Sequence, residues 1–200
     1  TAVFAQPPAP PRPQETAKAA SSALPYVVEQ LRTRVRFEND GTGRRERTTT
    51  VKVLDESGVR AFGELRLPYQ SESETLTITK VDVHKPDGST TSTPATAIQD
   101  VDVRPPTPAA TYLDIRQKII TVSALRPGDR IEVTAVWSVT KPLASDHFWF
   151  EHVFDVSEPV QDEQLEIDVP AQRAVAIKLR DGAPAEDHGG AGAVSGDRRV

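Results

Sequence analysis

The chain has 200 residues, enough for one domain with a substantial core, and a formal net charge of −5. This acidic balance argues against a general nucleic-acid binder, because phosphate contacts require clustered cations. The chain contains no cysteine, which excludes disulfides, thiolate metal sites and a cysteine nucleophile. It also lacks methionine, so we expect a processed product or a fragment.

The first residues resemble the end of a secretory signal. TAVFAQPPAP begins with a short apolar stretch, and Val3-Phe4-Ala5 fits a small-residue cleavage site. We therefore expect an exported protein, periplasmic or extracellular; the alternative is an ordinary flexible apolar terminus. No run of about 20 apolar residues occurs, so no membrane-spanning helix is predicted, and a membrane would be contacted only peripherally.

Residues 1–25 are predicted to be a signal-peptide remnant followed by a linker rich in proline and alanine. The tract QPPAPPRPQ favours extended polyproline II structure, and the following ETAKAASSAL is small and polar. Such a segment either tethers the domain at a distance or is a disordered terminus. A helical turn is considered only within Ala17–Leu24.

From Tyr26 onward the sequence predicts β-strands joined by turns. A first strand places these apolar residues on one face: Val27, Leu31, Val35 and Phe37. The turn NDGTG follows, then RERTTTVKVLD, which is rich in β-forming residues, and then a second turn, DESG. In TLTITKVDV the alternation changes phase at Thr79-Lys80, which predicts a bulge or burial on both sides.

Two later turns combine proline with glycine, KPDG at 85–88 and RPGD at 126–129. The clearest alternation follows the second turn: Ile131, Val133, Ala135, Trp137 and Val139. Further strands are expected within 112–122, 147–156, 165–169 and 175–179, with loops at 103–110 and 181–196. Residues 26–200 are therefore predicted to form an all-β antiparallel sandwich or open barrel, without a convincing amphipathic helix and with its C-terminal end truncated.

His152 interrupts an apolar row in the stretch HFWFEHVFDV, where one face of a strand would carry Phe148, Phe150, His152, Phe154 and Val156. On such a strand His147 and Glu151 point to the opposite face and lie about 13 Å apart, too far for one zinc ion. We interpret His152 as a packed residue of the core or its rim, with a hydrogen-bonded ring, and not as a catalytic or metal-binding group.

No catalytic constellation is evident. Ser195 in GAVSG has the wrong spacing for a nucleophile elbow, and GGAGAVSG lacks dinucleotide-binding spacing. His84 and His188 have no partner at ligand spacing, and no acid/base couple stands out among the carboxylates Asp146, Glu151, Asp155 and Glu158. We predict no catalytic residue, no cofactor and no metal, and therefore no enzyme activity in this chain, although an enzyme domain can follow it.

Two surface features are candidates for partner binding. Arg32, Arg34 and Arg36 share one strand face and form a basic stripe. Across the hairpin the stripe can extend to Arg44, Arg45 and Arg47. It would suit an acidic partner or lipid headgroups; the alternative is an ordinary solvated strand face. Trp149 lies opposite the Phe row, so it is a binding anchor if that face is open and core if it is covered. We favour the core interpretation.

Four groups of residues, in this order, resemble one bacterial family: Leu67-Pro68-Tyr69, Lys85-Pro86-Asp87-Gly88, Tyr112-x-Asp114-x-Arg116, and Leu125-x-Pro127-Gly128-x-x-Ile131-Glu132. The family is the domain of unknown function numbered thirty-eight fifty-seven, and the resemblance covers roughly Tyr26 to Val200. It implies a β-sandwich without established activity, typically N-terminal to a transglutaminase-like domain in exported proteins. The Cys, His and Asp of acyl transfer would belong to that downstream domain, so no catalytic residue is carried over.

The expected function is therefore a non-catalytic interaction or scaffold module that binds another polypeptide in an exported or membrane-associated assembly. The sequence leaves two alternatives. One is an accessory N-terminal domain of a transglutaminase-like peptidase or acyltransferase. The other is a carbohydrate-binding module that stacks a sugar on Trp149 or Tyr112.

Overall fold

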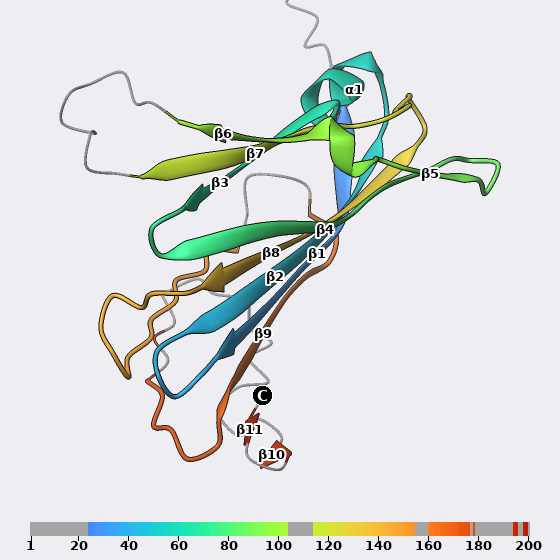
Figure 1. The fold of residues 1–200 in the computed structure, drawn as a ribbon. Coiled ribbons are helices and arrows are strands. Elements are labelled where there is room, and N and C mark those ends of the chain that lie inside the picture. The colour runs from blue at the N-terminus through green and yellow to red at the C-terminus, as the bar shows by residue number, and fades with distance from the viewer. Residues whose placement is uncertain are drawn as a thin grey trace, which may run out of the picture.

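The computed structural model describes residues 24–103, 114–154, 160–176, 178, 194–195 and 198–199. These residues form two sheets that pack as a sandwich and do not close into a barrel (Figure 1). The large sheet has eight strands in the order β10 (Val194–Ser195), β11 (Arg198–Arg199), β9 (Glu163–Pro170), β1 (Tyr26–Phe37), β2 (Gly43–Val53), β8 (Arg130–Val139), β4 (Glu74–His84) and β5 (Thr90–Ser92). The small sheet has the order β3 (Glu64–Gln70), β7 (Ile115–Thr121) and β6 (Ile98–Asp102), and a 3₁₀ turn spans Ala95–Ala97. The predicted all-β sandwich is confirmed.

One pairing departs from a purely antiparallel plan. β1 pairs antiparallel with β2 and parallel with β9, so that Val35 lies opposite both Arg45 and Ile167. The other strand pairs of both sheets are antiparallel. A parallel neighbour must come from a distant part of the chain, and no local sequence pattern reveals it.

Two bulges set which side chains face inward. The predicted bulge in β4 is present between Ile78 and Lys80. A second bulge lies in β1 between Val28 and Gln30, where no phase change was predicted. It places Val28 on the inner face with Leu31, and Val27 on the outer face opposite Lys52. The predicted inner position of Val27 is therefore wrong, because the extra residue reverses the strand's alternation.

The main core lies between the two sheets. Its buried members come from β1, β2, β4, β7, β8 and the segment after β7: Val28, Leu31, Val51, Val81, Val83, Ile120, Val122 and Ile131. Trp137 is 6% exposed and packs with Leu76 and Ala135. The predicted inner face of β8 is thus confirmed. Figure 1 shows that the small sheet covers only one end of the large sheet.

A short helix occupies part of the stretch predicted to turn at DESG. α1 spans Glu56–Phe62, and the Asp55 carboxylate caps it by accepting hydrogen bonds from the N–H groups of Ser57 at 2.7 Å and Gly58 at 3.0 Å. Phe62 at its end packs edge-on against Tyr26, with ring centroids 4.8 Å apart. The prediction of a simple turn is wrong because Asp55 begins a helix, a role that aspartate fills as readily as it fills turns.

The segment 147–154 is extended but, within the described part of the chain, pairs with no strand. Its side chains still alternate as predicted, with the Phe row half-buried over β1 and β9. Phe148 stacks on Phe37 with ring centroids 4.1 Å apart. The predicted strand is therefore an unpaired extended segment held by packing. Trp149 is 71% exposed, so the interpretation of Trp149 as core is wrong.

The strand expected at 175–179 is not formed at Val175. Ile177 and Leu179 lie outside the described residues, as do the expected leader and linker up to residue 23, Tyr112, and residues 104–110 and 181–193 of the two expected loops. Val194–Ser195, expected within the second loop, form β10.

Candidate functional site

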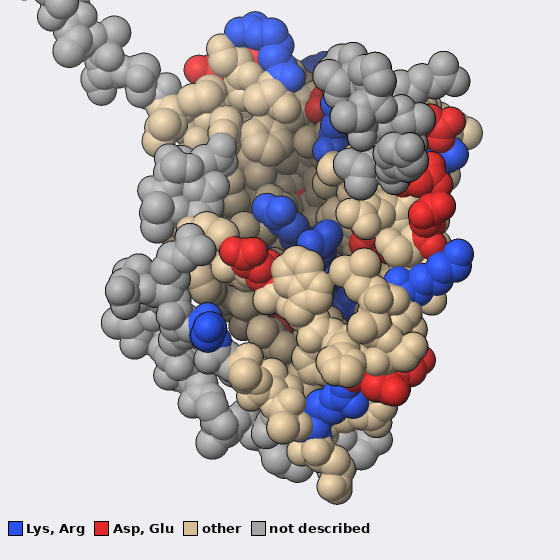
Figure 2. Space-filling view, turned by 90° about the vertical axis from the view of Figure 1, so that its left-hand side faces the viewer, with Lys and Arg blue, Asp and Glu red and all other residues tan. Residues whose placement is uncertain are grey.

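A groove crosses the inner face of the large sheet where the small sheet does not cover it. Two cavities of about 380 and 220 Å³ lie along it, and both are lined by Arg47, Thr49, Val51 and Phe62. Because they share these residues, the two cavities adjoin, and we describe them together as one groove. In Figure 2 this face is hollowed between its upper and lower parts, and Lys or Arg side chains lie in the middle beside an acidic side chain.

The floor of the groove comes from β2 and β8, which pair antiparallel. Thr49 lies opposite Val133, and Val51 lies opposite Ile131. Because side chains alternate along a strand, every second residue of each strand reaches the floor. Further along β8, Ala135 and Trp137 also line the floor. The floor is therefore mostly apolar.

The upper wall comes from α1 and β3. Phe62 of α1 and the apolar residues Leu65 and Leu67 of β3 line it. Trp137 Nε1 donates a hydrogen bond to the Pro68 carbonyl at 3.1 Å, which joins the floor to this wall. Within the described sheets β3 pairs only with β7, and its residues Leu65, Arg66 and Leu67 line the groove. Proline is tolerated there because an edge strand has no neighbour to which its missing N–H would donate.

The lower wall includes His152, Val153, Val160 and Glu163. His152 Nε2 lies 3.0 Å from Glu163 Oε1, and the two side chains are 16% and 10% exposed. The His152 ring also packs edge-on against Phe154 at 4.8 Å. The interpretation of His152 as a packed, hydrogen-bonded rim residue agrees with this geometry. The contact with β9 fastens the unpaired segment to the sheet.

Two arginines on β2 lie in or beside the groove without an ion pair to a carboxylate in the described structure. Arg47 is exposed and lines both cavities. The guanidinium of Arg45 lies 4.3 Å above the Trp137 ring, and its buried Nε has no hydrogen-bond partner. Burial lowers the pKa of Arg45; the charge of Glu74 opposes this effect, and that of Arg47 adds to it. This part of the inner face is therefore electropositive.

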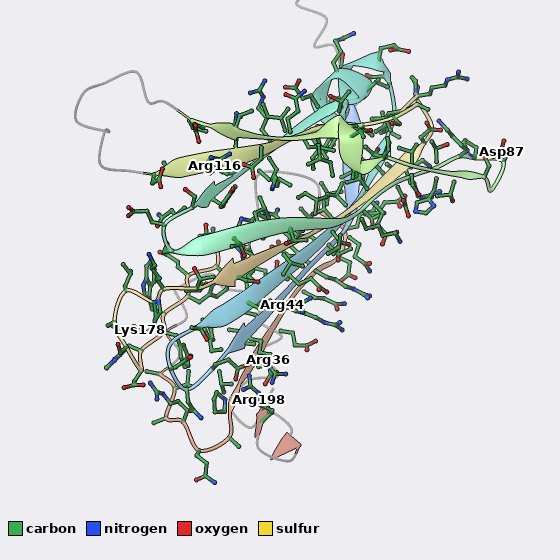
Figure 3. The ribbon with its side chains drawn as sticks, in the orientation of Figure 1. Arg36, Arg44, Asp87, Arg116, Lys178 and Arg198 are labelled. Atoms are coloured by element: carbon green, nitrogen blue, oxygen red, sulfur yellow. The ribbon has the colours of Figure 1, made fainter. Side chains whose placement is uncertain are left out.

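The predicted arginine stripe lies on the opposite, outer face of the large sheet. Arg32, Arg34 and Arg36 are exposed there, and the register adds Arg44 opposite Arg36 (Figure 3). Three of these four arginines have a carboxylate close by, which partly neutralises the stripe: Arg34 with Glu166 at 3.2 Å, Arg36 with Glu38 at 2.8 Å and Arg44 with Glu46 at 2.6 Å.

Arg45 and Arg47 do not join that stripe. They lie opposite Val35 and Thr33, so they belong to the inner face. Sequence reasoning missed the groove, although a signal was present. Arg45, Arg47 and Thr49 are in phase with Val51, which is 2% exposed. Two arginines on the apolar face of a strand are unusual, and this phase distinguishes them from Arg44.

Trp149 lies beside the groove and not in it, on the outward side of the segment 147–154. Val153, which lines the groove, is also strongly exposed, and Leu143 nearby is 88% exposed. Within the described residues no group of three His, Asp or Glu side chains could hold a metal ion, and no helix is long and apolar enough to cross a membrane.

The fold and groove define a two-sheet β-sandwich domain with a partly uncovered inner face. A family model for DUF3857, a domain of unknown function with a solved structure, matches residues 39–199, and the chain belongs to this family. No curated protein matches the chain.

One solved structure supports the fold, and the fold alone. A presumed protease from Parabacteroides distasonis ATCC 8503 superposes with a TM-score of 0.60 and 18% identity over 74% of this chain and 29% of that protein. Weaker matches include the CBM3a domain of the Clostridium thermocellum scaffoldin cipA, with a TM-score of 0.37 and 11% identity over 67% of this chain and 81% of that one. Another is an M1 zinc metallopeptidase from Deinococcus radiodurans, with a TM-score of 0.35 and 13% identity over 73% of this chain and 33% of that one. This chain thus spans less than a third of the P. distasonis protein.

Proposed function

We propose that the domain is a non-catalytic module that binds an extended polypeptide segment in its groove and so positions a partner in an exported assembly. The observation that carries this proposal is the groove, whose apolar floor runs past Arg47 in both directions. Apolar surface at the bottom of a concavity favours binding through the hydrophobic effect.

The edge of β3 supports a polypeptide as the occupant. A strand that is paired on one side only offers backbone N–H and C=O groups to an extended peptide, a common mode of peptide recognition.

Site-specific photo-crosslinking in the intact protein, in its native cells, tests this proposal. A photoreactive residue replaces Thr49 in the groove, and the control replaces the adjacent Thr50, which lies on the outer face opposite Glu132. We expect a discrete protein adduct from position 49 and none from position 50. Equal adducts from both positions, or none from position 49, would count against the groove. Fractionation of the same cells tests the proposed periplasmic or extracellular location.

A second candidate is an accessory domain N-terminal to a transglutaminase-like peptidase or acyltransferase. The family resemblance favours it, as does the match to a small part of a longer presumed protease. In that setting the groove would hold the polypeptide on which the enzyme acts. The coding sequence beyond Val200 tests this second candidate. A new domain with Cys followed by His and Asp supports it, and a stop codon or a helical repeat array excludes it.

A carbohydrate-binding role rests on one observation, the 71% exposure of Trp149, since an exposed aromatic ring can stack on a sugar. Binding to a glycan array that is abolished by Trp149→Ala would support this role. An array without binding, or binding unchanged by the substitution, would leave the polypeptide proposal in place.

A further inference from the structure

The distribution of charge around the groove contrasts with the rest of the large sheet. On the outer face several cations have carboxylates close by, such as Glu166 beside Arg34 at 3.2 Å and Glu132 beside Lys80 at 2.8 Å, whereas Arg32 has no ion pair among the described residues. On the inner face, Arg45 and Arg47 have no carboxylate at ion-pair distance among the described residues. Glu74 attracts Arg45 without forming an ion pair, and its carboxylate accepts a hydrogen bond from the Gln70 N–H at 2.9 Å.

The two arginines also repel each other. They are two positions apart on one face of β2, so their Cα atoms lie about 7 Å apart. Arg45 is half-buried against Trp137, and like charges interact more strongly where water is partly excluded. Among the described residues neither arginine forms an ion pair with a carboxylate, although Glu74 attracts Arg45 more strongly than Arg47 repels it. A carboxylate between the two guanidinium groups would remove the repulsion and gain charge-assisted hydrogen bonds.

We infer that the groove selects a segment carrying an acidic side chain, which Arg47 binds with Arg45 beside it. This inference rests on the proposed function and names the chemistry of the segment. Arg47 lines both cavities, and the groove continues on either side of it. A segment in the groove therefore passes Arg47, so the carboxylate belongs to an internal Asp or Glu and not to a chain terminus.

The lining also defines the residues that flank the acid. On one side of Arg47 the groove is lined by Val133, Ala135 and Trp137, and on the other by Val153 and Val160. An extended peptide points every second side chain to the same face. The recognised pattern is therefore apolar–x–acidic–x–apolar, with the three named positions facing the floor.

A selection from random dodecapeptides displayed on phage tests the inference with the 200-residue chain as bait. The wild type should enrich peptides with Asp or Glu at a fixed position between apolar residues. Arg47→Gln should keep the apolar positions and lose the acidic one. Arg32→Gln is the matched control, because Arg32 is an exposed arginine on the outer face and its replacement changes the net charge equally. It should select the same peptides as the wild type.

Calorimetry with one selected peptide and its Glu→Gln or Asp→Asn form measures how much the acidic side chain contributes to affinity. A charge-assisted hydrogen bond at a partly solvated site corresponds to roughly a tenfold loss of affinity for the neutral peptide. Arg47→Gln should bind both forms equally, and Arg32→Gln should discriminate as the wild type does. Unchanged near-ultraviolet circular dichroism of the two variants shows that each retains its fold.

The outcomes separate this inference from the proposed function. Selected peptides without a fixed acidic position, or an acidic position retained in Arg47→Gln, would overturn acidic selectivity while leaving the groove as a polypeptide site. Failure to enrich any sequence above the starting pool, together with no adduct at position 49, would overturn both.

Discussion

The ammonium group of Lys85 lies 2.6 Å from the Asp129 carboxylate, and these side chains are only 17% and 3% exposed. They come from the two glycine-containing turns at 85–88 and 126–129. The Asp129 carboxylate also accepts a hydrogen bond from the Arg126 N–H at 2.7 Å, and the backbone carbonyl of Asp129 accepts one from the Val53 N–H at 2.9 Å. The ion pair therefore joins the end of β4 to the start of β8 and the end of β2.

Lys85→Met should destabilise the domain by about 3 kcal/mol, because it leaves the buried Asp129 carboxylate without its cation. Chemical denaturation followed by circular dichroism measures this. Lys80→Met is the control, since Lys80 is 38% exposed beside Glu132 and solvent screens that pair to about 1 kcal/mol or less. Equal losses from the two variants would contradict a special role for the buried pair.

Trp137→Ala should cost about 3–5 kcal/mol, as truncation of a large buried aromatic residue does. The side chain is 6% exposed and its Nε1 is hydrogen-bonded to the Pro68 carbonyl. Trp149→Ala is the natural comparison, because this side chain is 71% exposed and its removal should change stability by no more than about 0.5 kcal/mol. Thermal unfolding of both variants distinguishes the two tryptophans. A large loss from Trp149→Ala would show that its side is covered in solution.

Gly41→Ala should destabilise the domain more than Gly88→Ala does. Both glycines have φ of 86°, so alanine carries similar backbone strain at either site, about 1–2 kcal/mol. An added Cβ at Gly41 would lie 2.6 Å from the His147 carbonyl oxygen, whereas at Gly88 nothing lies within 4 Å. The difference between the variants therefore isolates the steric clash.

Hydrogen exchange locates that effect. The Asp146 N–H donates to the Asp40 carbonyl at 3.1 Å, so displacement of this loop should accelerate exchange at Asp146 in Gly41→Ala alone. Similar stability losses and exchange rates in both variants would mean that the loop adjusts freely.

Acid should remove the stabilisation contributed by Glu132. A hydrogen bond from Lys80 lowers the pKa of Glu132 from its usual 4.5, more than burial raises it, and a hydrogen bond from His84 contributes. Since the folded-state pKa is below the unfolded one, this stabilisation is complete above about pH 4.5 and is lost as pH falls through the folded value. Denaturation between pH 6 and 3 should therefore show a shallower decline for Glu132→Gln. Glu151→Gln, at an exposed residue, controls for the lost charge, and the same shallow decline in both variants would contradict the assignment.

Much of the fold could be predicted because it is encoded in neighbouring residues. The inner face of β8 follows from alternation between Ile131 and Val139, and the bulge in β4 from a break in that alternation. The left-handed glycines Gly88 and Gly128, with φ of 86° and 92°, follow from turn chemistry.

The missed features depend on distant contacts or on elements too short to show a pattern. α1 has seven residues, barely two turns, so no helical period was visible, although Asp55 was a readable cap. The segment 147–154 shows the alternation of a strand, but pairing depends on neighbours that alternation does not specify. Likewise, alternation along β2 could have placed Arg47 on the inner face. The groove itself could not be predicted, because it exists only where the small sheet leaves that face uncovered.

The parallel pairing of β1 with β9 has a consequence for synthesis of the protein. Arg34 on β1 and its partner Glu166 on β9 are 132 positions apart, so the ribosome makes one neighbour of β1 long after β1 itself. Until then, one side of β1 has unpaired backbone groups that can bind another nascent chain. The arginines along its outer face repel those of a second copy during this interval.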